Sequence, residues 1–355
     1  MDIIINIDIE ATNRCNAVCH FCPRDATPHQ GHMSMETFEQ TLFRAVELRD
    51  HNRLMLGQDA ILEPNICGLG EPLINPNTPE FIRRLRAAGF DTCSMASNGA
   101  LLDQERGKAI LDAGVTRVNL NISDLGEDYD KVYNLPFDKT RDNVIRFIEM
   151  AKGDCEVHIV LVNHRQDPEH TERMKDYWRA RGVDGFVKYD VINRGGALFV
   201  DHMQYENFPE RRLAEQKMKQ CGSQWVCPVP YLWVFVGYDG LYYLCCSDWK
   251  KEAPMASVFD ASMLAITEQK LHHLTSREPV CKTCNHDPLN AVTEMIRAVD
   301  AGDAESAELD SMVKVFTEQS EQVIASVASA SELCPQVRTD RLEAEGTRLI
   351  PVIST

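Results

Sequence analysis

Residues 3–25 read IIINIDIEATNRCNAVCHFCPRD and join a β-rich run to a loop that contains three cysteines. The run at 3–11 is dominated by isoleucine and predicts a strand. The loop after it contains Cys15, Cys19 and Cys22, with Phe21 directly before the third cysteine. Three thiols within eight residues are too close together, and odd in number, for a set of disulfides. The stretch therefore predicts a first strand followed by a loop whose cysteines have another use.

Outward from this stretch, short β-rich runs alternate with helical patterns. Segments such as METFEQTLFRAVELRD and PEFIRRLRAAG space apolar residues three and four positions apart, and many of these segments end at glycine. Six β-then-α units in a row predict a parallel sheet with helices outside it. We expect an α/β fold in which residues 1–205 form a partial (βα)6 TIM-like barrel, with its reactive face at the carboxyl ends of the strands. The predicted strands are 3–11, 63–70, 91–99, 116–123, 156–163 and 185–193.

The composition restricts the class of protein. The chain has 355 residues, 44% of them apolar and 26% charged, which is enough for one large core and a smaller attached domain. A net charge of -17 without a strongly basic run argues against binding to nucleic acid. The start, MDIIINIDIE, lacks the basic region of a secretory signal, and nowhere do 18 apolar residues run together. We therefore expect a cytoplasmic protein with no membrane partner.

The 13 cysteines are expected to be reduced in that compartment and to act as metal ligands, reactive groups or buried side chains. One group lies in the first loop and a second lies near the end of the chain. Cys93 and Cys155 are set in apolar surroundings and are predicted to be structural. The second group contains Cys221, Cys227, Cys245, Cys246, Cys281 and Cys284, while Cys67, Cys93, Cys155 and Cys334 stand singly.

The first group, CNAVCHFC, resembles the C-x3-C-x2-C signature of the radical S-adenosylmethionine (SAM) superfamily, which follows the first barrel strand and usually has an aromatic residue before the last cysteine. Thiolates suit iron–sulfur clusters, and three of them leave one iron of a four-iron cube open. The resemblance implies that Cys15, Cys19 and Cys22 hold a 4Fe-4S cluster that binds SAM, and that Phe21 packs near the adenine. The alternative is a zinc site with His20 as the fourth ligand.

Three further motifs end successive predicted strands and agree with this resemblance. GLGEP (68–72) follows the second strand, and in the family such a loop meets the amino group of the cofactor's methionine. SNG (97–99) and NIS (121–123) end the third and fourth strands, where the family contacts the methionine carboxylate and the ribose. The cofactor-binding residues implied by the resemblance are Phe21, Gly68, Gly70, Glu71, Pro72, Ser97, Asn98, Asn121 and Ser123.

The second cysteine group surrounds a predicted β-hairpin in which GYDG (237–240) joins the runs YLWVFV and LYYL. Twelve residues separate Cys227 from Gly240, and four separate Gly240 from Cys245. This spacing resembles the twitch domain, the short form of the SPASM domain, in which C-x9-15-G-x4-C precedes further cysteines. The resemblance implies one auxiliary 4Fe-4S cluster held by Cys227, Cys245, Cys281 and Cys284. A zinc ribbon on the same cysteines is the alternative.

The predicted organisation therefore has three parts. Residues 1–205 form the barrel, and residues 206–290 form a small auxiliary iron–sulfur domain built from the β-hairpin and helices. Residues 291–355 are an acidic extension, helical to about 333 and without pattern thereafter. The motifs of residues 1–290 resemble those of the butirosin aminocyclitol dehydrogenase type. Anaerobic sulfatase-maturating enzymes and peptide maturases share the two-part plan with more cysteines, and fold alone does not choose between these chemistries.

Electron counting favours one reaction. The resemblance implies that SAM is cleaved to a 5'-deoxyadenosyl radical, which takes a hydrogen atom from the substrate. A substrate radical with a hydroxyl group becomes a ketone by losing a proton and an electron, and the auxiliary cluster can accept that electron. We predict the dehydrogenation of a small polar molecule such as a sugar, an aminocyclitol or a nucleoside. A flavodoxin or ferredoxin-like protein is the expected electron donor.

Other functions remain open at the level of sequence. An epimerase needs a thiol that returns a hydrogen atom, for which Cys246, Cys67 and Cys221 are the candidates. A peptide or protein maturase is expected to have a small domain that grips a leader peptide, and no such domain precedes the first predicted strand. From another class, a non-catalytic zinc-binding protein would use the acidic C-terminal helices to bind a partner.

Three residues are candidates for substrate chemistry. Arg194, in VINRGG after the sixth strand, offers a fork of donors to hydroxyls, a carboxylate or a phosphate, unless it is a solvated loop residue. Asp248, in CCSDW, is a candidate acceptor for a substrate proton. Cys246 is a candidate to replace Cys245 as a ligand or to donate a hydrogen atom.

Overall fold

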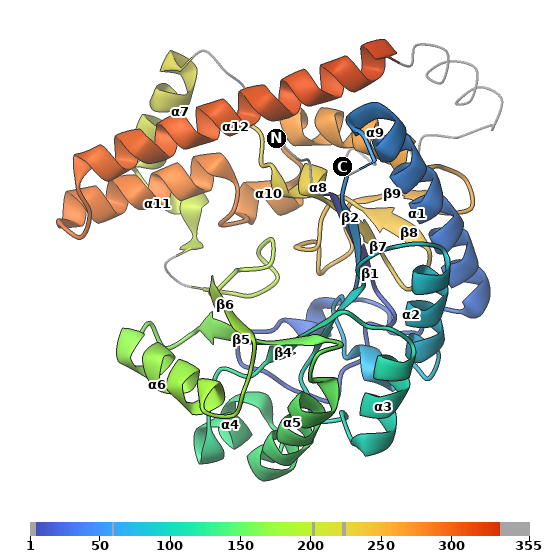
Figure 1. Ribbon diagram of the computed structural model, residues 1–355. Coiled ribbons are helices and arrows are strands. Elements are labelled where there is room, and N and C mark those ends of the chain that lie inside the picture. Colours follow the sequence, from blue (N-terminus) through green and yellow to red (C-terminus); the bar gives the residue numbers. More distant parts are fainter. Residues whose placement is uncertain (1–4, 59, 201–202, 222–224, 334–355) are drawn as a thin grey trace. The chain divides into compact units, whose positions relative to one another are not determined.

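The computed structural model describes residues 5–58, 60–200, 203–221 and 225–333. The chain divides into two compact units, each of which is described by itself (Figure 1). The first unit runs to Val191 and also includes Phe235–Leu241. The second unit comprises Ile192–Val234 and the chain from Tyr242 onward. The three domains predicted from the sequence remain predictions, because this division by contacts has only two units.

The first unit is built on six parallel strands in the order β6-β5-β4-β3-β2-β1. Each strand pairs with its neighbour in the sequence, and helices follow the strands on the outer side of the sheet (Figure 1). The sheet is open, and the predicted α/β fold with a partial (βα)6 barrel is confirmed. The strands are β1 (Ile5–Ile9), β2 (Leu62–Ile66), β3 (Ser94–Ser97), β4 (Arg117–Asn121), β5 (Glu156–Asn163) and β6 (Gly185–Asp190). The helices are α1 (Met35–Leu56), α2 (Thr78–Ala87), α3 (Gln104–Asp112), α4 (Gly126–Tyr133), α5 (Phe137–Ala151) and α6 (Pro168–Arg179), with the 3-10 turns η1 (Arg24–Ala26) and η2 (Pro72–Ile74).

Side-chain caps begin several of these helices where the sequence changes from strand to helix. Ser34 accepts a hydrogen bond from the Thr37 amide at the start of α1, at 3.0 Å. Asp103 does the same for the Arg106 amide at the start of α3, at 2.9 Å. Such caps satisfy amides that have no partner inside the helix, so they fix where each helix begins after its strand.

The two faces of the sheet differ in polarity. On one face the side chains are apolar and fully buried, as in Ile7, Ile66 and Leu120. On the other face they are polar: Asp8 pairs in register with Asn65, and Asn65 with Ser94. Strands of a parallel sheet are usually apolar on both faces. In this chain polar and apolar residues alternate along the first strands, so one face of the sheet is available for polar contacts.

The second unit is mainly helical. The predicted hairpin is confirmed by β7 (Trp233–Val236) and β8 (Leu241–Tyr243), with Gly237 donating to the Leu241 carbonyl at 2.8 Å, and its central residues Phe235–Leu241 are counted with the first unit. The first two residues of the predicted run YLWVFV, Tyr231 and Leu232, form the end of helix α8 instead of a strand. The other elements are η4 (Tyr205–Asn207), α7 (Arg211–Gln220), α8 (Val229–Leu232), β9 (Pro254–Ser257), α9 (Met263–Ser276), α10 (Pro279–Thr283), α11 (Pro288–Ala301) and α12 (Ser306–Leu333).

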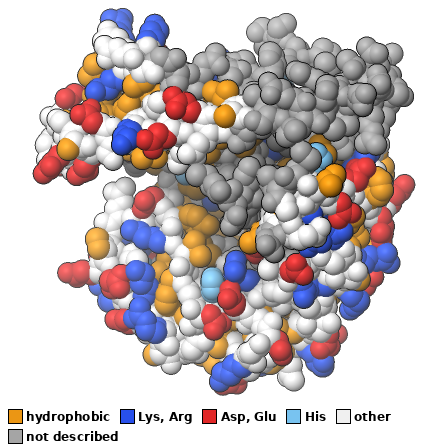
Figure 2. Space-filling view, turned by 45° about the horizontal axis from the view of Figure 1, so that its top comes forward, with side chains coloured by type: hydrophobic (Ala, Val, Ile, Leu, Met, Phe, Trp, Pro, Cys, Tyr) orange, Lys and Arg blue, Asp and Glu red, His pale blue; other side chains and the backbone are white. Residues whose placement is uncertain are grey.

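The C-terminal extension forms the helices that the sequence predicts as far as residue 333, namely α11 and α12. The patternless tail predicted at 334–355 lies outside the described residues. Within the described part of the chain, no helix is both long and apolar enough to span a membrane. On the face seen in Figure 2, Lys and Arg side chains are interspersed with Asp and Glu, so the visible surface carries charges of both signs.

Candidate functional site

The three-cysteine loop follows β1 and is bound to the end of helix α4. The Val18 amide donates to the Tyr133 carbonyl at 3.0 Å, and the His20 amide donates to the Val132 carbonyl at 3.2 Å. Arg24 closes the loop by donating to the Ala17 carbonyl at 2.9 Å. Carbonyls at the end of a helix lack partners within the helix, so the loop and α4 satisfy each other.

The thiols of this loop lie close enough to influence one another. Burial, followed by the neighbouring Cys22 and Cys15 thiols, raises the pKa of Cys19. The Cys15 sulfur accepts from the Ala17 amide at 3.4 Å and lies 3.9 Å from the Asn98 side-chain nitrogen. Thiols that raise one another's pKa are stabilised as thiolates by a cationic metal group. The structure thus brings the three predicted ligands together beside the SNG motif.

Glu71 of the GLGEP motif joins three of the motif loops. Its side chain is only 1% exposed, and its carboxylate accepts from the Ser97 hydroxyl at 2.9 Å and from the Asn98 amide at 2.8 Å. Its own amide donates to the Arg14 carbonyl at 2.8 Å. Burial raises the pKa of Glu71, and the hydrogen bond from the Asn98 amide opposes that rise. The carboxylate holds protein groups in this structure, and its contact with the cofactor stays a prediction.

The two glycines of GLGEP allow close approach of the backbones. A Cβ atom on Gly70 would lie 2.6 Å from the Thr12 carbonyl oxygen, and it would also meet the Arg14 carbonyl. Gly68 has φ +148°, and a Cβ there would lie 2.7 Å from Cγ of Glu10. Pro72 is buried at the start of η2. GLGEP can therefore pack directly on the chain that leads into the cysteine loop.

Phe21 lies in a small aromatic group. Its ring meets the Tyr133 ring edge-on, with 5.7 Å between centroids, and lies 5.2 Å from the His164 ring. His164 belongs to the loop after β5. The predicted contact of Phe21 with an adenine is not tested by these neighbours.

A buried carboxylate that the sequence did not single out organises the ends of β4 and β5. Asp124 is fully buried and accepts from His164 at 2.7 Å and from Arg165 at 2.7 Å, and a nitrogen of His170 lies 3.4 Å away. We name these four residues the Asp124 cluster. Asp124 directly follows the NIS motif at the end of β4. Adjacent parallel strands end at the same edge of a sheet, so this position was the signal in the sequence that could have indicated the cluster.

The remaining predicted cofactor residues have the following contacts. The Asn98 side chain donates to the Asn16 side chain at 2.9 Å. The Ser123 hydroxyl accepts from the Val162 amide at 2.8 Å and so ties β4 to β5. Asn121 is half-buried at the end of β4. The Cys67 sulfur accepts from the Asn65 side chain at 3.0 Å. Asn98 and Ser123 thus support the strand ends, and their cofactor roles stay predictions.

The second unit brings four of its cysteines together. Burial, followed by the Cys284 and Cys281 thiols among its causes, raises the pKa of Cys227 well above the usual value. Burial also raises the pKa of Cys245 well above the usual value, and the neighbouring Cys246, Cys284 and Cys281 thiols raise it further. Burial, with Asp287 and Cys284, raises the pKa of Cys281 to about 12. Cys227 and Cys245 are therefore each near enough to Cys281 and Cys284 to be influenced by them, and all of these except Cys227 are buried.

The three candidates for substrate chemistry also lie in the second unit. Both carboxylate oxygens of Asp248 accept backbone amides, from Glu252 at 2.9 Å and Ala253 at 2.8 Å, and the side chain is 3% exposed. The Arg194 guanidinium lies over the Trp249 ring, 5.5 Å from its centroid, and Arg194 has φ +53°. Cys246 is half-buried next to Cys245. Asp248 stabilises its own turn in this structure, and the chemical roles of all three stay predictions.

The loop that contains Arg194 packs against the Cys281–Cys284 turn. The Asn193 side chain donates to the Thr283 carbonyl at 2.6 Å, and the Thr283 hydroxyl donates to the Gly195 carbonyl at 2.8 Å. Gly195 has φ +61°, and a Cβ atom there would meet Val280 and lie 3.0 Å from the Ser247 carbonyl oxygen. Glycine at this position therefore permits the close packing around the buried thiols.

The donor sets test which inorganic group fits. Among the described residues, no three His, Cys, Asp or Glu side chains are arranged to hold one metal ion. The three thiols of the first unit and the four of the second are all sulfur donors without a disulfide, which is the ligand type of iron–sulfur clusters. The residues present therefore fit a cluster with three protein ligands in the first unit and one with four in the second.

The first unit is an open parallel (βα)6 sheet with three cysteines in its first loop, beside polar strand-end motifs, which is an α/β fold with the donor type of an iron–sulfur site. Residues 9–177 match the model of the Radical SAM superfamily. Residues 9–177, just under half of the chain, thus form a radical SAM domain. SAM and one 4Fe-4S cluster are the cofactors that such a domain implies.

Curated relatives match part of the chain. A "Probable GTP 3',8-cyclase" from Metallosphaera sedula is 24% identical over 60% of this chain and 64% of its own length. A GTP 3',8-cyclase from Peptoclostridium acidaminophilum is 33% identical over 56% of this chain and 55% of its own. The chain thus matches between about half and two thirds of the length of such relatives.

Two structural matches, SuiB and anSMEcpe, show the fold. Streptococcus suis SuiB bound to the precursor peptide SuiA aligns with TM-score 0.58 and 12% identity, over 81% of this chain and 71% of SuiB. Native anSMEcpe with bound AdoMet aligns with TM-score 0.56 and 15% identity, over 87% of this chain and 99% of anSMEcpe. BtrN in complex with AdoMet and 2-DOIA aligns with TM-score 0.49 and 16% identity, over 80% of this chain and 94% of BtrN.

Proposed function

We propose that this radical SAM enzyme is an oxidoreductase that dehydrogenates a small polar molecule and carries one auxiliary 4Fe-4S cluster in its second unit. The observation that carries the proposal is the convergence of Cys227, Cys245, Cys281 and Cys284, with the last three 7–9% exposed. Four thiolates, three of them buried, fill every ligand position of a four-iron cluster, whereas the three of the first unit leave one position open. A closed group of this kind suits electron transfer better than substrate activation.

The residues of the first unit divide the work of holding the cofactors. On this proposal Cys15, Cys19 and Cys22 hold the SAM-binding cluster, and Glu71 positions the SNG loop through its bonds to Ser97 and Asn98. When bound, the cluster and SAM supply a 5'-deoxyadenosyl radical that abstracts a hydrogen atom. The protein groups around them fix these loops, since GLGEP hydrogen-bonds to SNG and SNG hydrogen-bonds to the cysteine loop.

The proposed reaction balances with one electron acceptor. A secondary alcohol becomes a ketone when its carbon loses a hydrogen atom, its hydroxyl loses a proton and one electron leaves. The hydrogen atom ends in 5'-deoxyadenosine, and the proton passes to solvent or a protein base. The group held by the four cysteines would supply the acceptor for the electron. One SAM is consumed for each ketone formed.

The polar face of the sheet supports a polar substrate that is not an anion. The Asn65 side chain donates to Asp8 at 3.0 Å and accepts from the Ser94 hydroxyl at 3.1 Å, so these three form a hydrogen-bonded row. Arg117, in register with Ser94 on the same face, is ion-paired with Glu63 and Glu156. Farther along, Asn119 pairs in register with His158. Amides, hydroxyls and a carboxylate suit substrate hydroxyls and amines, whereas a triphosphate is bound by arginine and lysine. A sugar or aminocyclitol therefore fits this face better than the GTP in the relatives' names.

Stoichiometry tests the proposal. Purified anaerobically and supplied with reductant, SAM and a panel of sugars, aminocyclitols and nucleosides, the wild type is expected to form one carbonyl product per 5'-deoxyadenosine. Cys227→Ala is expected to cleave SAM without forming a ketone. Product that is isomeric with its substrate, or product formed with catalytic amounts of SAM, would contradict dehydrogenation. A flavodoxin or ferredoxin-like donor is part of the proposal and is tested by replacing the chemical reductant with such a protein.

A further inference from the structure

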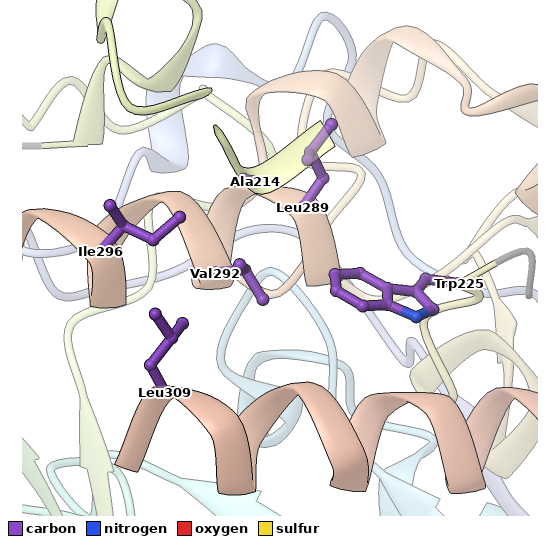
Figure 3. Close-up of a cluster of buried hydrophobic side chains, with 6 residues drawn as sticks. All are labelled: Ala214, Trp225, Leu289, Val292, Ile296 and Leu309. Atoms are coloured by element: carbon purple, nitrogen blue, oxygen red, sulfur yellow. The ribbon is translucent and has the colours of Figure 1, made fainter. Parts of the chain in front are cut away.

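The C-terminal helices share one hydrophobic core with a segment that leads to an auxiliary ligand. In Figure 3 the side chains of α7, α11 and α12 converge with Trp225, which stands two residues before Cys227. Trp225 is 5% exposed, and its ring lies 6.3 Å from the Phe316 ring of α12. The buried members of this core are Ala214, Trp225, Leu289, Val292, Ile296 and Leu309. Sequence analysis found no chemistry in these helices, but their core reaches the thiol site.

Helix α11 holds the turn that contains two of the proposed ligands. The Asn290 side chain is fully buried, and its nitrogen donates to the carbonyls of Lys282 at 2.9 Å and Cys284 at 2.8 Å. The Cys281 carbonyl lies 3.4 Å from the same nitrogen. One amide group thereby orients three carbonyls of a four-residue turn.

Helix α7 fixes the orientation of that amide. Arg211 donates to the side-chain oxygen of Asn290 at 2.8 Å. Because the oxygen faces a cationic donor, the nitrogen must face the carbonyls of the turn. Helices α7 and α11 therefore act together on Cys281 and Cys284.

Helix α12 holds the chain at a third proposed ligand. The Ser320 hydroxyl accepts from the Val226 amide at 2.9 Å and donates to the Phe316 carbonyl at 2.6 Å. Val226 directly precedes Cys227 and is 1% exposed. The Trp225 side chain also donates to the Thr317 hydroxyl, at 3.3 Å. The chain entering Cys227 is thus bonded to α12 on two successive residues.

We infer that helices α11 and α12 are a positioning scaffold for the auxiliary cluster, in which Asn290 orients the Cys281–Cys284 turn and Ser320 orients Cys227. This inference rests on the proposed auxiliary cluster. Asn290 and Ser320 act through the backbone next to the ligands and do not themselves bind the metal. Hydrogen bonds from outside a metal's own ligand shell fix ligand orientation, and losing one typically costs about 10- to 100-fold in metal affinity.

The test compares the full-length chain with three variants after anaerobic cluster reconstitution. Asn290→Leu keeps the approximate size but removes every hydrogen bond of the amide, and Ser320→Ala removes one acceptor. Thr293→Val is the matched control, because Thr293 is also fully buried on α11 but bonds only to the Leu289 carbonyl of its own helix. The readouts are the rate of iron loss to a chelator, the reduction potential of each cluster and the thermal transition.

We expect Asn290→Leu to release the auxiliary iron about 10- to 100-fold faster than Thr293→Val, and Ser320→Ala to do so by a smaller factor. The cluster held by Cys15, Cys19 and Cys22 should keep its potential and its spectral response to SAM in every variant. If Asn290→Leu does not fold, the rate of iron loss from Ser320→Ala tests the scaffold in its place. Unchanged iron loss and potential in folded variants would overturn the scaffold while leaving the proposed function standing. A wild type without a second cluster would overturn both.

Discussion

The two cysteine groups are held in different ways. The first lies on a loop whose three thiols are half-buried, and its partners are neighbouring strand-end loops such as those of Glu71 and Asn98. Three cysteines of the second group are buried, and side chains of helices hold the backbone around them. On the proposed function, the first arrangement holds the cluster that binds SAM, and the second holds the auxiliary cluster. The proposal therefore assigns the chemistry to the first site and electron transfer to the second.

The largest expected effect comes from removing one ligand of the open site. Cys19→Ser is expected to reduce SAM cleavage to background, because three thiolates are the minimum for the proposed SAM-binding cluster. The rate of 5'-deoxyadenosine formation measures this effect. Cys93→Ser is the control, since Cys93 is fully buried and belongs to neither group. Cleavage near the wild-type rate in Cys19→Ser would remove that residue from the ligand set.

A large loss of stability is expected from the Asp124 cluster. Asp124→Asn leaves Arg165 without its buried partner and should lower the free energy of unfolding by about 3–5 kcal/mol. Asp128→Asn is the control, because Asp128 is exposed and lies 3.2 Å from the same Arg165. That control should cost at most about 1 kcal/mol. Denaturant unfolding measures both, and equal effects would show that the burial of Asp124 contributes nothing.

Two glycine substitutions separate the sites. Gly70→Ala forces a Cβ against the Thr12 and Arg14 carbonyls and should weaken SAM binding while leaving the auxiliary iron in place. Gly195→Ala forces a Cβ against Val280 and the Ser247 carbonyl. It should lower the auxiliary iron content while leaving SAM binding unchanged. We expect about tenfold in each case, since a shift of the supporting contacts is transmitted to the ligands. Calorimetry with SAM and iron analysis of both variants measure the effects.

Gly153→Ala controls for backbone strain in that comparison. Gly153 has φ +87°, but a Cβ atom added there would meet nothing within 4 Å, so its substitution adds strain without a clash. It should leave both SAM affinity and iron content unchanged. Loss of both properties in either Gly70→Ala or Gly195→Ala would contradict the independence of the two sites.

The smallest expected effect is at the cap of the helix that follows SNG. The amide of Arg106 lowers the pKa of Asp103, so the charged cap stabilises the fold above the usual carboxyl pKa, and this stability is lost as the pH falls through the lowered value. Asp103→Ala should cost about 1 kcal/mol at pH 7. The difference from the wild type should shrink on acidification below about pH 4. A difference that does not depend on pH would show that charge has no part in the cap.

The sequence was sufficient for elements that depend on local pattern. The six strands and the order of the strand-end motifs follow from periodicity and spacing, which neighbours in the sequence determine. The set of four cysteines in the second unit came instead from the resemblance to the twitch domain. The Asp124 cluster was missed because its members span residues 124–170 and meet only when β4 and β5 pair. Asn290 was missed for a related reason: a single asparagine in a helix has no pattern, and its function depends on carbonyls six to nine residues away.

Iron and sulfide analysis of anaerobically purified protein tests the central claim most directly. The wild type, a Cys15/Cys19/Cys22→Ala triple variant and a Cys227/Cys281→Ala double variant would be compared, with zinc measured in the same samples. We predict about eight irons in the wild type and about four in each variant, since two four-iron clusters are held by separate sets of cysteines. About four irons with one zinc in the wild type would contradict the auxiliary electron acceptor on which the dehydrogenase proposal depends.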